Sequence, residues 1–144
     1  MTDNITKFIM DTMVADPVLN SLTESKYRAE YPRTDMLLNG TSKTVVGVVP
    51  LKVSTTSYFL STYRSLIKTE ADFQIVVLCG KGQTDAYCWS VINRMHKLFQ
   101  DAEHIETTYR IFVNSISEEV KPDQPYMGNW LGTLTLSIIE FDPK

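Results

Sequence analysis

The chain has 144 residues, of which 43% are apolar and 22% are charged, a composition that indicates a globular protein and argues against disorder. Its 14 basic and 17 acidic residues give a net charge of −3, so no surplus of positive charge is present for a phosphate backbone and sequence-specific nucleic-acid binding is not expected. The longest apolar runs, residues 45–49 and 75–79, are too short to span a membrane, and no secretory signal is visible. We expect one structural domain over residues 1–144.

Two helices are predicted at the N-terminus. The first has one apolar face with helical spacing, formed by Ile5, Phe8, Ile9 and Met13, and Thr2 or Asp3 can cap its first turn. Asp16 followed by Pro17 provides a second cap and a proline at the first helical position, so residues 17–22 are expected to form a short helix. In this second helix Val18, Leu19 and Leu22 are expected to point inward.

The middle of the chain has weaker patterns. Residues 24–40 are predicted to form an extended connection around the body, and residues 45–49 a strand that Pro50 stops. Gly47 within that strand indicates an edge position or a bulge. Residues 58–66 suit either a strand or a helical turn, and the aromatic residues Tyr58, Phe59 and Tyr63 are expected in the core.

The C-terminal half is more regular. Residues 73–79 are almost wholly apolar, as expected of a strand at the centre of a sheet. A glycine-containing turn follows, and Thr84 is the expected N-cap of an amphipathic helix that ends near Gln100, with Asp85 in its first turn. The apolar face of this helix consists of Cys88, Val91, Ile92, Met95, Leu98 and Phe99.

Two further strands are predicted as an antiparallel pair, residues 109–117 and residues 130–141. The second alternates well, with Gly132, Leu134, Leu136 and Ile138 on one face. The fold class that follows is α+β: a mostly antiparallel sheet of about four to five strands, with an N-terminal helix and one long amphipathic helix packed on it.

No catalytic, cofactor-binding or metal site is expected from these residues. Cys88 and His96 lie about 12 Å apart along one helix and on different sides of it, so they cannot share a metal ion. The turn at residues 80–84 is shorter than a phosphate-binding loop, and Asp85 would repel an anion there. A small α/β enzyme or ligand-binding domain that uses this turn remains the alternative from a different class.

A long connection between the last two strands, residues 118–129, is the expected partner-binding segment. It contains two prolines and a glycine, and connections of this length are often functional. Tyrosine, methionine and tryptophan are enriched in the cores of protein interfaces. The candidate interface residues are Glu118, Lys121, Asp123, Tyr126, Met127 and Trp130.

The order of these elements resembles the tail terminator (tail completion) proteins of tailed bacteriophages. The resemblance is carried by residues 73–79, the helix over residues 84–100, and the strand pair 109–117 and 129–141. It implies a structural virion protein without enzymatic activity or cofactor. Such a protein forms a homo-oligomeric ring at the head-proximal end of the tail tube, ends tube polymerisation and joins the tail to the neck.

The partners that the resemblance implies are further copies of the chain, the tail tube protein and a neck or connector protein. The implied location is the virion tail, assembled in the host cytoplasm, with no membrane contact. A stopper or adaptor protein of the head-tail connector is an alternative within the same class, because these proteins have similar sizes and also lack catalytic residues.

Overall fold

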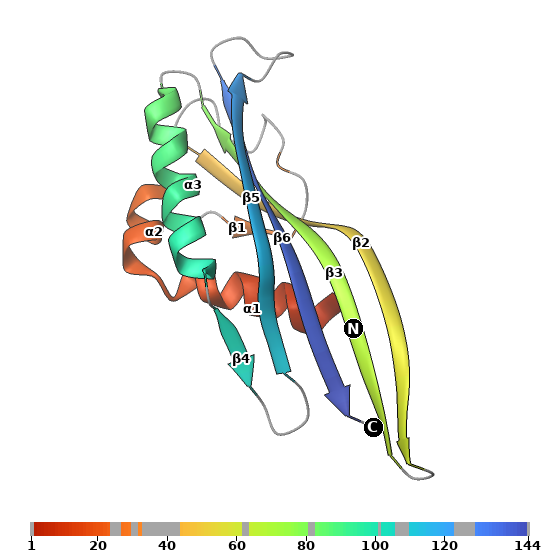
Figure 1. The fold of residues 1–144 in the computed structure, drawn as a ribbon. Helices are drawn as coiled ribbons and strands as arrows, with labels where there is room; N and C mark the ends of the chain where they lie inside the picture. Colours follow the sequence, from red (N-terminus) through yellow and green to blue (C-terminus); the bar gives the residue numbers. More distant parts are fainter. Residues whose placement is uncertain are drawn as a thin grey trace.

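The structure, a computed structural model, describes residues 2–23, 27–29, 32, 44–61, 64–80, 83–100, 102–105, 110–122 and 129–143. In this part of the chain three helices lie on one face of a curled six-stranded sheet (Figure 1). The helices are α1 (Thr2–Val14), α2 (Pro17–Thr23) and α3 (Asp85–Phe99). The strands are β1 (Tyr27–Arg28), β2 (Thr44–Ser61), β3 (Arg64–Cys79), β4 (Glu103–Ile105), β5 (Arg110–Pro122) and β6 (Trp130–Pro143).

The strand order in the sheet is β1-β2-β3-β6-β5-β4. The long strands β2, β3, β6 and β5 pair antiparallel to one another, whereas β1 pairs with β2 in parallel. The expected α+β class is therefore right in outline. The expected strand number and antiparallel character need correction, because the sheet is mixed and has six strands in the described part of the chain. The short strands β1 and β4 were missed because two or three residues carry no recognisable period.

The main core lies between the sheet and the helices. Leu134, Leu136 and Ile138 of β6 are fully buried, as their alternation predicts. The predicted α3 is confirmed: the hydroxyl of Thr84 accepts a hydrogen bond of 3.1 Å from the backbone N–H of Tyr87, and the apolar face of the helix is buried apart from Leu98, which is half-buried. The opposite face of the sheet, which no described helix covers, is called the helix-free face below.

The two N-terminal helices are also confirmed, and Asp16 joins the second of them to α3. Its Oδ2 accepts from the backbone N–H of Leu19 at 2.9 Å, as an N-cap does, while Arg94 donates to both carboxylate oxygens at 2.6 and 2.8 Å. The hydrogen bond from Arg94 is the main reason that the pKa of Asp16 is lowered. The expectation for Val18 is wrong, since this side chain is 49% exposed.

The middle of the chain forms a long hairpin that extends past the ends of the other strands (Figure 1). Pro50 does not stop β2, contrary to expectation: the strand continues to Ser61, and a register irregularity lies between Pro50 and Lys52. Among the described residues, β2 has a neighbour on its outer side only where β1 pairs with Val46 and Gly47. A proline, which lacks a backbone N–H, is tolerated at such an edge position.

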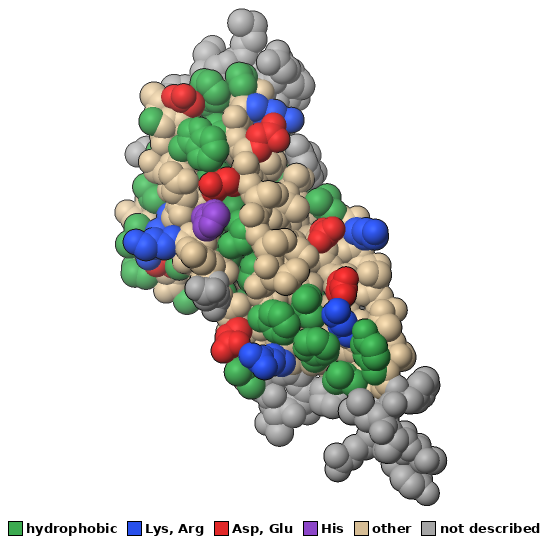
Figure 2. All heavy atoms as spheres, viewed as in Figure 1, with side chains coloured by type: hydrophobic (Ala, Val, Ile, Leu, Met, Phe, Trp, Pro, Cys, Tyr) green, Lys and Arg blue, Asp and Glu red, His purple; other side chains and the backbone are tan. Residues whose placement is uncertain are grey.

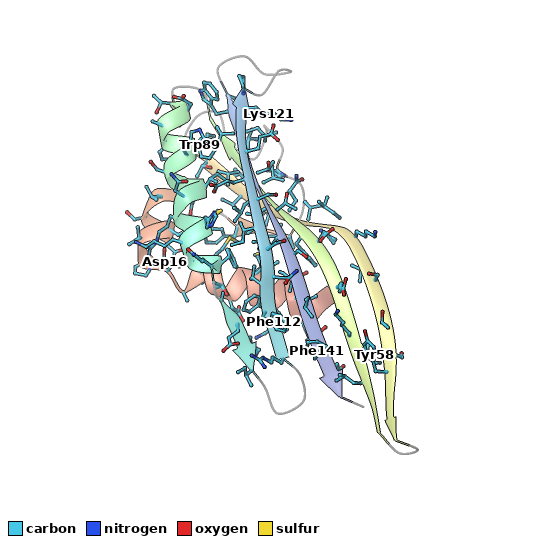
Figure 3. All side chains as sticks on the ribbon, viewed as in Figure 1. Asp16, Tyr58, Trp89, Phe112, Lys121 and Phe141 are labelled. Carbon is cyan, nitrogen blue, oxygen red and sulfur yellow. The ribbon has the colours of Figure 1, made fainter. Side chains whose placement is uncertain are left out.

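The expected core position of Tyr58 is also wrong, because 44% of this side chain is exposed. It lies in the part of β2 that extends beyond the helices (Figure 3). The side chains of Phe59 and Tyr63 are outside the described residues, as is most of the connection predicted for residues 24–40.

Candidate assembly surfaces

The end of the β5–β6 hairpin carries the residues that the sequence predicts to bind a partner. Strand β5 runs to Pro122, so Glu118 and Lys121 are strand residues and the connection begins later than predicted. The backbone pairing of β5 with β6 continues through these residues: Glu118 pairs with Leu134, and Lys121 pairs with Leu131. Asp123, Tyr126 and Met127 lie outside the described residues.

The described side chains at this end have local partners. Glu118 lies 3.2 Å from His96 Nδ1 of α3, whereas Glu119 points to the opposite face, where its Oε1 is 3.9 Å from Lys121 Nζ. The two carboxylates therefore do not form a pair, as expected. Trp130 is half-buried and packs against the main core. Contacts between side chains this exposed contribute little to stability, so both carboxylates remain usable by a partner.

Two exposed strand edges lie on opposite sides of the sheet. The first, called the β2 edge, is defined by Lys52, Ser54 and Thr56, and all three side chains are exposed. The second, called the β5 edge, is defined by Ser115, Ser117 and Glu119, which are exposed as well. Among the described residues, β4 pairs with β5 only from Arg110 to Phe112, so the β5 edge lies beyond the end of β4.

An aromatic cluster lies at the lower end of the helix-free face (Figures 2 and 3). The rings of Phe112 and Phe141 have centroids 5.9 Å apart, and the guanidinium of Arg110 is 5.5 Å from the centroid of Phe112. These residues line an open hollow of about 440 Å³ together with residues of the adjoining β4 segment. Both phenylalanines are half-buried, and a partly exposed apolar surface can serve as a protein contact.

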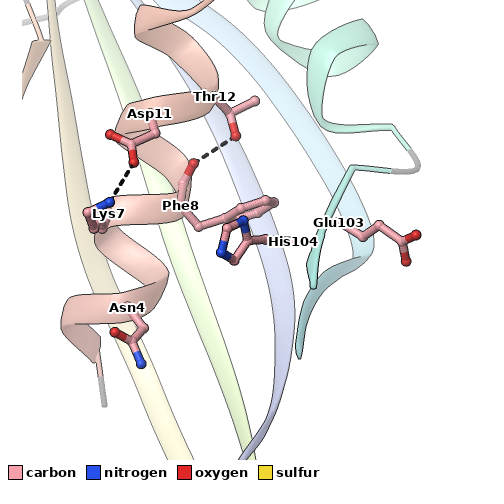
Figure 4. Close-up of a pocket in the computed structure, with 7 residues that line it drawn as sticks. All are labelled: Asn4, Lys7, Phe8, Asp11, Thr12, Glu103 and His104. Atoms are coloured by element: carbon pink, nitrogen blue, oxygen red, sulfur yellow. Dashed lines mark hydrogen bonds and ion pairs between the residues drawn. The ribbon is translucent and has the colours of Figure 1, made fainter. Parts of the chain in front are cut away.

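A polar pocket of about 220 Å³ separates α1 from β4 (Figure 4). Its polar side chains belong to both elements: Lys7 of α1 donates to Asp11 at 3.1 Å, and Glu103 and His104 of β4 line the opposite wall. The ring of His104 lies 6.5 Å from that of Phe8. Lys7 forms an ion pair with Asp11, and Glu103 forms one with Arg110, so both carboxylates that line the pocket have a basic partner.

The two cysteines and the turn before α3 are the remaining candidates for chemistry. Cys79 and Cys88 are buried free thiols, and the contact of Cys88 with the Cys79 sulfur, together with burial, raises the pKa of Cys88. The raised pKa keeps Cys88 in its protonated form, and both thiols are buried in the core. In the turn, Gln83 N–H donates to Gly80 O at 3.1 Å, while Lys81 and Gly82 lie outside the described residues.

Neither a metal cluster nor a membrane helix is found in the described residues. They contain no group of three or more His, Cys, Asp or Glu side chains that could hold a metal ion. None of their helices has the length and apolar character needed to cross a membrane.

No protein-family model matches the chain, and no curated protein matches it in sequence. A solved structure does share its fold: a chain in the structure described as "Virion of native gene transfer agent (GTA) particle" superposes with a TM-score of 0.57 at 12% sequence identity. The superposition covers 94% of the present chain and 92% of that chain. The likeness therefore extends over nearly the whole fold of both proteins.

Proposed function

We propose that this protein is a structural component of a virion, and that it forms a ring at the head-proximal end of a tail tube. The observation that carries the proposal is the near full-length likeness in fold to a chain of a gene transfer agent virion. The order of sequence elements, which resembles that of tail terminator proteins, supports the same reading. In this role the protein ends tube polymerisation and connects the tail to the neck, and it performs no catalytic step.

The geometry of the sheet is compatible with ring formation. A ring needs two different surfaces on each subunit, one to meet the next subunit on each side. The β2 edge and the β5 edge provide two such surfaces, because they lie on opposite sides of one sheet. The β5–β6 hairpin end and the aromatic cluster are then available for further contacts with a neighbouring subunit, the tube protein or the neck protein.

The test is to mix the purified protein with tail tubes of the same particle and to image them. We expect an extra ring at one end of each tube and no further elongation when tube protein is added. Tubes that keep growing, with no added density at either end, would contradict the proposal. A measurement of the mass of the free protein beforehand tells whether the ring exists before it meets the tube.

The predicted contact of the hairpin end is tested in the same assay. Trp130→Ala and a deletion of residues 121–127 should each reduce capping, because the segment is proposed to contact neighbouring subunits or the tube. Val18→Ala, which truncates a side chain that is 49% exposed on α2, is the control and should cap normally. If both hairpin variants cap as well as the unchanged protein, the hairpin end is not the contact.

A further inference from the structure

We infer that neighbouring copies of this chain join edge to edge, with the β5 edge of one copy added to the β2 edge of the next, so that one sheet continues across subunits. The inference adds the subunit contact to the proposed function, and the closure of these contacts into a ring rests on that proposed function. The starting observation is that, in the part of the chain that the structure describes, no strand pairs with the outer side of β2 beyond Gly47 or with the outer side of β5 beyond Phe112. The β2 edge has Lys52 at one end, but residues 53–63 contain neither a charged side chain nor a proline, the devices that usually protect an edge from pairing.

The strand directions permit this contact. Each long strand is antiparallel to its neighbour in the order β2-β3-β6-β5, so β2 and β5 run in opposite directions. A second copy in the same orientation therefore presents its β5 antiparallel to β2 of the first. The helices of both copies then lie on the same face of the continued sheet. Because the contact is heterologous, repeating it can close a ring by rotation.

The side chains select a register. Lys52 and Ser54 lie on the helix-free face with their β3 partners Asp72 and Glu70, and this face continues through β6 to Glu119 and Ser117 of β5. If the same faces are kept aligned, Lys52 of one copy can lie opposite Glu119 of the next. Oppositely charged residues that face each other across a strand pair attract.

The same register places Ser54 opposite Ser117 and Thr56 opposite Ser115. Both are pairs of small hydroxyl side chains, which fit directly opposed positions. Shifting the strand by two residues in one direction would place Lys52 opposite Lys121, where the like charges repel. The charge pattern therefore favours the first register over this neighbouring one.

The offset between the two edges agrees with a closed sheet. Within one subunit Ser54 lies at the level of Ile139, whereas Ser117 lies at the level of Thr135. The proposed pairing therefore shifts each copy by four residues, about 14 Å, along the strand direction relative to its neighbour. The four long strands of each copy span about 19 Å across the sheet. The resulting strand tilt of about 35° is close to the tilt of closed β-barrels.

Space is present on the β5 side of the proposed contact. A hollow of about 210 Å³ lies beside Asn114 and Ile116, between β5 and the end of α3, and can take side chains of the added strand. Beyond Tyr58, the β2 strand of one copy reaches the part of the neighbouring β5 that already pairs with β4. The end of β2 must therefore leave the continued sheet at this point. The register irregularity between Phe59 and Ser61 provides a bend at this point.

The inference is tested by a disulfide between copies. In the double variant Ser54→Cys with Ser117→Cys, directly opposed residues are close enough to cross-link, and mild oxidation of the assembled protein should give a ladder of covalent multimers on a non-reducing gel. Ser54→Cys combined with Thr135→Cys is the matched control, because Thr135 lies one strand inside the β5 edge. This control should remain uncross-linked.

The outcomes separate the edge contact from the proposed function. If the protein caps the tubes but forms no cross-links, the ring proposal stands and the edge contact is wrong. Covalent multimers that fail to cap tubes support the edge contact and contradict the tail-terminator role. Protein that stays monomeric with and without tubes overturns both.

A charge exchange tests the register itself. Lys52→Glu should weaken assembly several-fold, and Glu119→Lys should do the same, because each places like charges opposite one another. The double variant Lys52→Glu with Glu119→Lys should restore assembly, as followed by analytical ultracentrifugation. Failure of the double variant to recover would reject this pairing.

Discussion

Glu140 is a buried carboxyl group beneath the N-terminal helix. Its residue is 2% exposed, and its Oε2 accepts a hydrogen bond of 3.1 Å from the side chain of Asn4. Burial is the main cause of its raised pKa, and the nearby Asp142 adds to the effect. The ionised form is therefore less favourable in the folded protein than in the unfolded chain. Folding stability falls as the pH rises from the ordinary glutamate pKa through the raised one.

We expect Glu140→Gln to remove this pH dependence. The amide keeps a hydrogen-bonding group near Asn4 but carries no charge to bury, so the variant should be at least as stable as the unchanged protein at neutral pH. Urea unfolding between pH 4 and 8 measures the effect, and Glu119→Gln on the exposed β5 edge is the control. A variant whose stability falls with pH in parallel with the unchanged protein would show that Glu140 is not responsible.

Gly132 sets the distance between α3 and the sheet. A Cβ atom at this position would lie 2.9 Å from both Cys88 Sγ and Ile92 Cγ1, closer than these atoms can approach. We expect Gly132→Ala to destabilise the fold by about 1–3 kcal/mol, as overpacking of a core usually does. Thr133→Ala, one residue along on the helix-free face, should have a smaller effect. Chemical denaturation of both variants makes the comparison, and equal effects would argue against close packing here.

At the scale of elements, α3 shows that an N-cap and an apolar stripe predict a helix correctly when tertiary packing agrees with them. Thr84 caps its first turn and the apolar stripe faces the core, as the sequence predicts. We expect Thr84→Ala to lower the free energy of unfolding by about 1 kcal/mol, because the Tyr87 N–H loses its acceptor. Thr84→Ser keeps the hydroxyl and should be nearly neutral. Thermal unfolding of the two variants distinguishes a cap from a simple packing effect.

The strands were less predictable than the helices. The imperfect alternation of β5 arises from a register irregularity between Val113 and Ser115, which moves later side chains to the other face. The extension of β2 past Pro50 could not be inferred, because a proline ends a strand only where a neighbour needs its N–H. Whether such a neighbour exists depends on residues distant in the sequence.

At the scale of the whole molecule, the described helices cover one face of the sheet, and the other face carries small polar and charged side chains. Ser117, Thr133 and Thr135 lie along its middle, between apolar residues at one end and the aromatic cluster at the other. A sheet with one such face and two exposed edges is suited to repeated addition of identical subunits. The proposed ring and its edge contact follow from this arrangement and not from any single residue.

The sequence by itself determined the three helices, the central position of residues 73–79 and the pairing of the last two long strands. These features depend on local periodicity, caps and apolar content, which can be read from neighbouring residues. Only the tertiary structure decided the long β2–β3 hairpin, the parallel β1 strand and the two strand edges that lack a neighbour among the described residues. An edge is defined by a missing neighbour, and which strands lack neighbours is fixed only when the whole chain has folded.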